Sequence, residues 1–101
     1  MSDEKISTKD LLKTNREEIL RIATKHGAYN VRIFGSFARG ETKEESDVDF
    51  LVEVGPKRSF FFPGGLVADL EYLLERKVDV VTVKGLNKAL RDRVLKEAVA
   101  L

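Results

Sequence analysis

The sequence predicts an α/β (α+β) fold, a small mixed β-sheet covered by helices, and three observations predict it. Apolar residues recur at helical spacing in three segments of the chain. Short runs rich in β-branched residues lie between those segments, and glycine or proline marks most of the boundaries. With a helical turn counted between the first two strands, the order reads α-β-α-β-α-β-α, which is typical of a sheet layered with helices.

Length and composition indicate one ordinary domain that covers residues 1–101. The hydrophobic fraction of 43% is enough for a core, although 35% of the residues are charged. The formal charge of +1, with both signs interleaved, gives no signal for nucleic-acid binding. No apolar run approaches the roughly 20 residues that span a bilayer, and the N-terminus lacks a signal core, so we expect a cytoplasmic location.

The first helix is expected from about Ser7 to His26. Ser7 or Thr8 can cap it, Asp10 lies in its first turn, and Gly27 stops it. We interpret His26 as a residue of the helix end rather than as a catalytic group. The apolar stripe of this helix consists of Leu11, Leu12, Ile19, Ile22 and Ala23.

Three strands and two further helices follow. The strands are expected at residues 31–34, 47–54 and 78–83, with a helical turn and a loop at 39–46. After Pro63, Gly64 and Gly65, a second helical stripe contains Leu66, Val67, Leu70, Leu73 and Leu74. The last helix is expected from Asn87, a candidate N-cap, with an apolar face formed by Leu90, Val94 and Ala98.

The residue inventory restricts the chemistry. The chain has no cysteine and one histidine, which excludes disulfides, thiolate nucleophiles and the usual His/Cys zinc sites. Hydroxyls and carboxylates must therefore carry any catalysis.

Gly35 and Ser36 end the first strand with a candidate phosphate site. A glycine there lets the backbone turn so that N–H groups point outward, and the serine hydroxyl adds a donor. A Gly-Ser pair is also a common turn without a ligand, and that alternative stays open for the pair alone.

Asp47 and Asp49 open the second strand. Side chains alternate along a strand, so the two carboxylates project from the same face and repel each other unless a cation compensates. Oxygen ligands without histidine or cysteine favour magnesium or manganese. Solubilising charges, a calcium loop and metal-dependent glycosyl transfer are the alternatives for Asp-x-Asp alone.

Asp79 interrupts the apolar third strand, where a buried charge needs a partner or a metal. If this strand lies beside the second one, Asp79 completes a cluster of three carboxylates. An ion pair with Arg76 or Lys77 is the structural alternative.

These residues resemble a known family. Residues 35–40 (Gly-Ser-Phe-Ala-Arg-Gly) and 46–52 (Ser-Asp-Val-Asp-Phe-Leu-Val) are similar to the signature of the minimal nucleotidyltransferase family, within the DNA polymerase beta-like superfamily. Residues 76–81 resemble the strand that carries the third aspartate of that family. The resemblance covers most of the chain.

The resemblance implies a fold with a nucleotidyltransferase core and a set of site residues. Asp47, Asp49 and Asp79 would be catalytic and would ligate two Mg²⁺ ions, or Mn²⁺, while Asp79 also activates an acceptor hydroxyl. Gly35 and Ser36 would hold the terminal phosphates of ATP. Arg39 would neutralise triphosphate charge, or else would pair on the surface with Glu41 or Glu44.

The same resemblance implies a partner. The smallest family members resemble the antitoxin of a two-gene toxin-antitoxin pair, and some transfer AMP to a tyrosine of a helical HEPN-domain toxin. A chain of 101 residues has no room for a domain that holds an acceptor, so we expect the partner to supply it. The alternatives are a non-catalytic toxin-binding module and transfer to a small molecule such as an aminoglycoside.

Two apolar segments are candidates for a surface that meets another molecule. The three phenylalanines at positions 60–62, next to Pro63, cannot all face one core. The helical face from Leu90 to the end of the sequence extends beyond what we expect one small core to cover. A partner protein or a homodimer would bury such segments.

Overall fold

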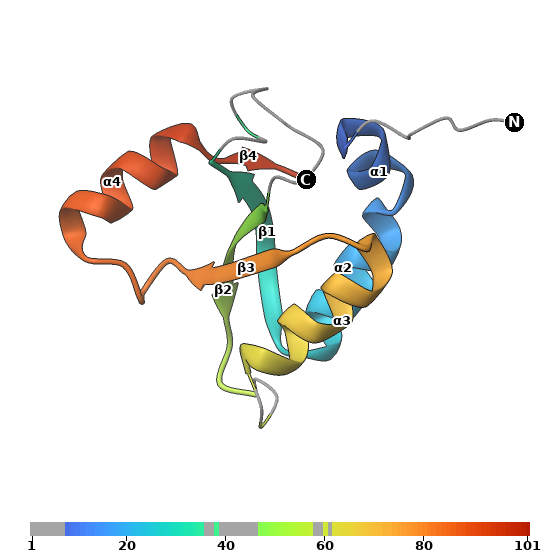
Figure 1. Cartoon of the computed structure of the whole chain (residues 1–101). Coiled ribbons are helices and arrows are strands. Elements are labelled where there is room, and N and C mark those ends of the chain that lie inside the picture. The colour runs from blue at the N-terminus through green and yellow to red at the C-terminus, as the bar shows by residue number, and fades with distance from the viewer. Residues whose placement is uncertain (1–7, 36–37, 39–46, 58–59, 61) are drawn as a thin grey trace, which may run out of the picture.

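The computed structural model describes residues 8–35, 38, 47–57, 60 and 62–101. One mixed sheet contains the four strands of this part of the chain in the order β3-β2-β1-β4. Helices α1, α2 and α3 lie on one side of the sheet and α4 on the other (Figure 1). The predicted fold class, a mixed sheet covered by helices, is confirmed. The helical turn expected at residues 39–46 falls outside the described residues.

The first predicted helix is two helices, α1 (Thr8–Thr14) and α2 (Arg16–Lys25). The prediction of one continuous helix is wrong because Asn15 interrupts it. The backbone of Asn15 departs from helical geometry, with φ of −99° and ψ of 12°, while its side-chain Nδ2 and its backbone N–H both donate to the carbonyl of Leu11, at 2.9 and 3.1 Å. Gly27 follows the end of α2 with φ of 82°, so the predicted stop is confirmed.

His26 is the C-cap residue of α2 and is buried. Its Nε2 lies 2.7 Å from the Oδ2 of Asp69 on α3, so this contact ties the two helices together. The hydrogen bond from His26 lowers the pKa of the Asp69 carboxyl below its ordinary value. The interpretation of His26 as a helix-end residue is confirmed, and its role here is to link helices.

The central strands are β1 (Ala28–Phe34) and β2 (Val48–Val54), which pair antiparallel. Strand β1 begins at Ala28 rather than at residue 31, and its register shifts between Tyr29 and Arg32. This irregularity interrupts the alternation of buried and exposed side chains along the strand, so the pattern did not indicate the first residues of β1. Strand β2 matches its predicted range to within one residue at its start.

Helix α3 (Gly64–Leu74) connects β2 to β3 (Val78–Thr82), which runs parallel to β2. A parallel pair needs such a crossover connection. The helix begins at Gly64, so the glycines that were expected to precede the helix form its first turn, after a cis Phe62–Pro63 bond. Phe62 packs against the core, whereas Phe60 is 90% exposed, and Phe61 is outside the described residues.

Helix α4 (Lys88–Glu97) begins as predicted. The Asn87 side chain accepts a hydrogen bond from the backbone N–H of Leu90 at 2.9 Å, which confirms it as the N-cap. The chain then forms a short strand that was not predicted, β4 (Val99–Ala100), which pairs antiparallel with β1. The expectation that a helical face continues to the end of the sequence is therefore wrong.

The main core lies between the sheet and the helices α1, α2 and α3. Its members on β2 are alternate residues, and Leu51, which is fully buried between them, lies on the opposite face of the strand. Among the described helices, none is long and apolar enough to cross a membrane. The buried core residues are Leu12, Ile19, Ala23, Ala28, Val31, Val48, Phe50, Val52, Leu66, Leu70, Leu74, Val78 and Val80.

Candidate active site

The strand directions bring three predicted site segments to one edge of the sheet, meaning the edge formed by the ends of the strands and not by an outer strand. Strands β2 and β3 are parallel, so their first residues lie at the same edge, and the antiparallel β1 ends there. This edge therefore holds Gly35, which follows β1, together with Asp49 of β2 and Asp79 of β3. The topology thus gathers residues that are far apart in sequence.

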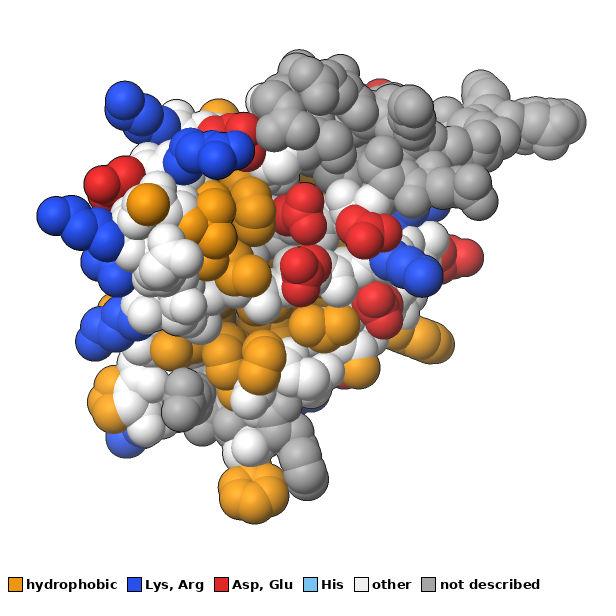
Figure 2. Space-filling model, turned by 60° about the vertical axis from the view of Figure 1, so that its left-hand side comes forward, with side chains coloured by type: hydrophobic (Ala, Val, Ile, Leu, Met, Phe, Trp, Pro, Cys, Tyr) orange, Lys and Arg blue, Asp and Glu red, His pale blue; other side chains and the backbone are white. Residues whose placement is uncertain are grey.

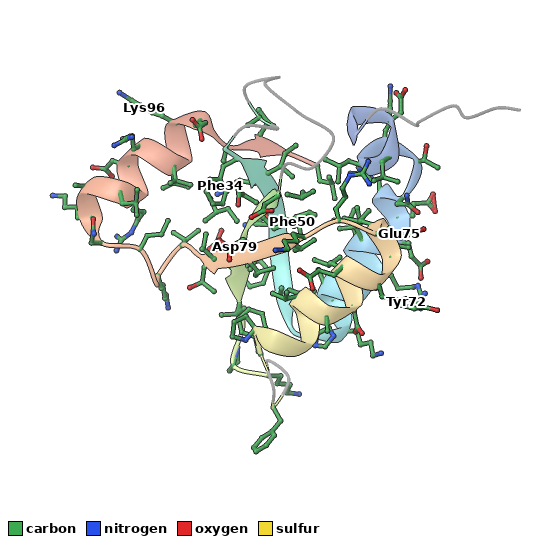
Figure 3. The ribbon with its side chains drawn as sticks, viewed as in Figure 1. Phe34, Phe50, Tyr72, Glu75, Asp79 and Lys96 are labelled. Atoms are coloured by element: carbon green, nitrogen blue, oxygen red, sulfur yellow. The ribbon has the colours of Figure 1, made fainter. Side chains whose placement is uncertain are left out.

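The strand register sets Asp49 directly opposite Asp79 on the neighbouring strand, and Phe34 opposite Asp49 on the other side. Neighbouring strands lie only about 4.8 Å apart, so the two aspartates are adjacent on one face of the sheet. The sequence argument assumed that these strands were neighbours, and the sheet order confirms it. Figure 3 shows Asp79 and Phe34 on the side of the sheet toward α4.

Asp47 precedes β2 and is exposed, and Asp79 is also exposed. The expectation that Asp79 is buried in its strand is wrong, because its side chain lies on the face of β3 opposite the buried core residues Val78 and Val80. No ion pair joins Asp79 to Arg76 or Lys77 within the residues that the structure describes. Asp79 is therefore open to another molecule rather than neutralised inside the fold.

Of the three predicted carboxylates, Asp49 and Asp79 form a pair on adjacent strands, and Asp47 lies two positions before Asp49 in the sequence. Across the described ranges, no three His, Cys, Asp or Glu side chains are gathered closely enough to hold a metal ion as they stand. Like charges repel, which favours separated carboxylates. The metal-binding roles of Asp47, Asp49 and Asp79 stay predictions.

Gly35 has a conformation and a neighbour that disfavour any larger residue. Its φ is 75°, in the left-handed region that favours glycine. A Cβ atom built on Gly35 would lie 2.4 Å from the Oδ2 and 3.3 Å from the Cγ of Asp49. The glycine thus lets the turn after β1 lie directly against the Asp49 carboxylate.

Glu97 is a residue of this edge that the sequence did not reveal. Its Oε2 accepts a hydrogen bond of 2.7 Å from the backbone N–H of Gly35, across 62 positions of sequence. In this structure a carboxylate of α4 accepts the Gly35 N–H, and the expected role of Gly35 in holding a phosphate stays a prediction. Glu97 resembles any other charge of an amphipathic helix, so no local pattern distinguishes it.

The other predicted phosphate-binding residues, Ser36 and Arg39, lie outside the described residues, as do Glu41 and Glu44. Around the described part of the site, the charge distribution is visible on the surface. Figure 2 shows acidic side chains gathered beside a hydrophobic patch, with Lys and Arg mostly along the margin of that face. A face of this kind suits a ligand that brings cations with it.

Comparison with known proteins adds a family match. A family model described as a nucleotidyltransferase domain matches residues 15–101. A candidate protein adenylyltransferase of Methanocaldococcus jannaschii is 44% identical over 84 residues, which span 83% of this chain and 90% of the relative. The protein adenylyltransferase MntA of Thermococcus cleftensis is 38% identical over 91 residues, which span 82% of this chain and 92% of that protein.

Solved structures agree with this match. The structure of a candidate minimal nucleotidyltransferase is similar with a TM-score of 0.82 and 42% sequence identity, over 100% of both chains. A toxin-antitoxin structure with AMP-PNP has a TM-score of 0.73 at 20% identity, over 85% of this chain and 71% of that chain. At that identity the second likeness concerns the fold alone.

Proposed function

Because the chain belongs to the nucleotidyltransferase domain family, we propose that it transfers AMP from ATP to a hydroxyl group of a partner protein. The observation that carries this proposal is the register that sets Asp49 beside Asp79, next to the turn at Gly35. Both relatives described above bear the name of protein adenylyltransferases, and the alignments cover most of this chain.

The donor set at the sheet edge fits a hard divalent cation. Asp49 and Asp79 supply carboxylate oxygens from adjacent strands, and Asp47 lies two positions before Asp49. Oxygen donors of this kind suit Mg²⁺ or Mn²⁺. We infer that these three aspartates hold two Mg²⁺ ions, which when bound would neutralise the charge of the triphosphate.

The remaining roles are proposed from the resemblance of these residues to the family signature. Ser36, directly after Gly35, donates its hydroxyl to the terminal phosphates, and Arg39 neutralises their charge. Asp79 is exposed, so the hydroxyl of a second macromolecule can reach it and give up its proton there. The acceptor oxygen then bonds to the α-phosphorus, the bond from that phosphorus to the bridging oxygen breaks, and pyrophosphate leaves.

The acceptor is proposed to be a tyrosine of a helical HEPN-type toxin, with this chain as the antitoxin. The toxin-antitoxin structure of similar fold supports the idea of a partner. Apolar side chains on α4 and β4 provide a surface for it, since Leu90, Leu95 and Val99 are 42%, 39% and 45% exposed. A surface of this kind also suits a homodimer, which the test below separates from a toxin complex.

Mass spectrometry of the chain co-expressed with a HEPN-type partner tests the proposal. The expected result is an AMP group on a partner tyrosine that disappears with Asp79→Asn. Glu75→Gln is the matched control. Glu75 is exposed at the end of α3, and its substitution removes one negative charge at a place away from the site (Figure 3). Modification that persists with Asp79→Asn would refute the catalytic assignment.

The same experiment, together with an assay on aminoglycosides, distinguishes two other functions and a homodimer. A stable complex without modification would identify a non-catalytic toxin-binding module. Transfer to an aminoglycoside in a separate assay, with no partner modified, would identify a small-molecule nucleotidyltransferase. A homodimer that does not bind the co-expressed partner would place the apolar surface of α4 and β4 between two copies of this chain.

A further inference from the structure

Glu97 is held at the candidate site from both sides of its position in the chain. One turn earlier in α4, Val94 is buried, and directly afterwards β4 pairs with β1 through Ile33 opposite Val99 and Arg32 opposite Ala100. The side chain of Glu97 is itself half-buried. Because the backbone on both sides of Glu97 is already fixed, only the rotamer freedom of the side chain is lost when it makes a hydrogen bond.

The bond that Glu97 makes fixes a peptide group of the site. Its Oε2 accepts from the Gly35 N–H at 2.7 Å, a charge-assisted geometry. The Asp49 carboxylate also lies close to Gly35, since a Cβ built there would be 2.4 Å from its Oδ2. Gly35, the residue at which the chain leaves β1, is therefore bonded to a carboxylate of α4 and lies beside a carboxylate of β2.

The alternative is that Glu97 acts through its charge alone. A negative charge near the proposed phosphate site would repel ATP, and the removal of that charge would then improve nucleotide binding. The geometry favours the other role, because the Gly35 N–H is already satisfied inside the protein and its peptide plane sets the direction of the turn.

We propose that Glu97 is a positioning residue, which orients the turn at Gly35 for nucleotide binding without touching the nucleotide itself. This inference rests on the proposed nucleotidyl transfer for its kinetic readout. It also has a readout of its own, since the Gly35 amide proton reports the bond directly. The C-terminal end of α4 thereby becomes part of the active-site scaffold rather than only a covering helix.

Two substitutions separate the effect of the length of the Glu97 side chain from the effect of its charge. Glu97→Gln keeps the length and an acceptor oxygen but removes the charge, and Glu97→Asp keeps the charge but shortens the reach. A positioning role predicts a Kd for ATP with Mg²⁺ within about threefold of wild type for Glu97→Gln and about tenfold weaker for Glu97→Asp, by the worth of one charge-assisted hydrogen bond. Asp92→Ala, which removes an exposed charge from the same helix, should leave the affinity unchanged.

Amide hydrogen exchange of Gly35 completes the experiment. Protection of this amide should persist with Glu97→Gln and fall with Glu97→Asp and Glu97→Ala, even if the nucleotide is never turned over. If Glu97→Asp binds ATP like wild type while Glu97→Gln does not, or if either variant binds more tightly, the positioning role is overturned. A wild-type chain that neither binds nor transfers nucleotide would refute the proposed function, whereas intact Gly35 protection in Glu97→Ala would refute this inference alone.

Discussion

At the scale of single residues, the turn after β1 depends on Gly35 for two independent reasons. Its φ of 75° disfavours any residue with a Cβ atom, and that atom would overlap the carboxylate of Asp49. The first reason concerns stability and the second concerns the site. A substitution at Gly35 should therefore reduce activity by more than the loss of folded protein explains.

Gly35→Ala tests this expectation. The left-handed conformation should cost about 1–2 kcal/mol of unfolding free energy, and displacement of Asp49 should remove most of the transfer activity. Gly55→Ala is the matched control, since nothing lies within 4 Å of a Cβ built on Gly55 at the end of β2. Thermal denaturation and an activity assay on both variants are the measurements. A Gly35→Ala enzyme with full activity would mean that Asp49 need not stay where it lies.

The pair formed by His26 and Asp69 gives stability a pH dependence. The hydrogen bond lowers the pKa of Asp69, so its contribution is present above the ordinary range for Asp and is lost as the pH falls through the folded-state pKa. Asp69 is partly exposed, with 43% of its side chain accessible, so the contribution should stay below about 1 kcal/mol.

Asp69→Asn is expected to lower Tm slightly near neutral pH and to converge with wild type only when the pH falls below the lowered folded-state pKa of Asp69, where its carboxyl is protonated. Thermal melts at several pH values, with Asp92→Asn as the exposed control, measure this difference. A gap between the Asp69→Asn and wild-type melts that stays constant with pH would contradict the linkage.

At the scale of elements, the helix ends were predictable where a local residue determines them. Asn87 caps α4 and Gly27 follows α2, as their sequence context indicates. The break at Asn15 was missed because the apolar stripe continues across it, and a side-chain bond to the carbonyl of Leu11 is not visible in the pattern. Strand β4 was missed because its two residues carry no periodicity of their own.

Removal of the α4 cap should be measurable as a loss of stability. Asn87→Ala takes away the acceptor for the Leu90 N–H and should cost about 1 kcal/mol, which lowers Tm by roughly 4–8 °C for a domain of this size. Asn87→Asp keeps an acceptor and should retain most of the wild-type Tm. Lys88→Ala, at the exposed first position of α4, is the neutral control. Equal melts for Asn87→Ala and Lys88→Ala would show that the cap contributes little.

At the scale of the whole molecule, the sequence predicted which aspartates meet but not how they are held. Strand order and register bring Asp49 and Asp79 together, and the Asp-x-Asp pattern with a third aspartate anticipated this. The contribution of Glu97 arises from α4 crossing back to the sheet edge, a tertiary relation across 62 positions that periodicity cannot encode. The exposure of Asp79 likewise depends on which face of β3 is covered, since Val78 and Val80 on the other face are buried in the core.

Nucleotide binding should stabilise the assembled molecule by mass action. ATP with Mg²⁺ at a hundred times its Kd should add about 2.7 kcal/mol to the unfolding free energy. Asp49→Asn should abolish that gain while it leaves the ligand-free Tm unchanged or higher, because it removes one of two adjacent like charges. Thermal shift assays measure both quantities, with Glu75→Gln as the control. A ligand-free Asp49→Asn chain that unfolds at much lower temperature would make Asp49 a structural residue.

Asp49 and Asp79 are separated in sequence by the crossover helix α3, and this separation has a consequence for the nascent chain on the ribosome. A ribosome adds about 5–20 residues each second, so Asp79 is synthesised about two to six seconds after Asp49. During that interval the hairpin of β1 and β2 can form, yet its Asp49 has no neighbour on the next strand. The hydrogen bond from the Gly35 N–H can form only later, after Glu97 has been synthesised. If Glu97 positions Gly35 as proposed, a nascent chain can pair β1 with β2 and still lack a complete site until α4 has been made.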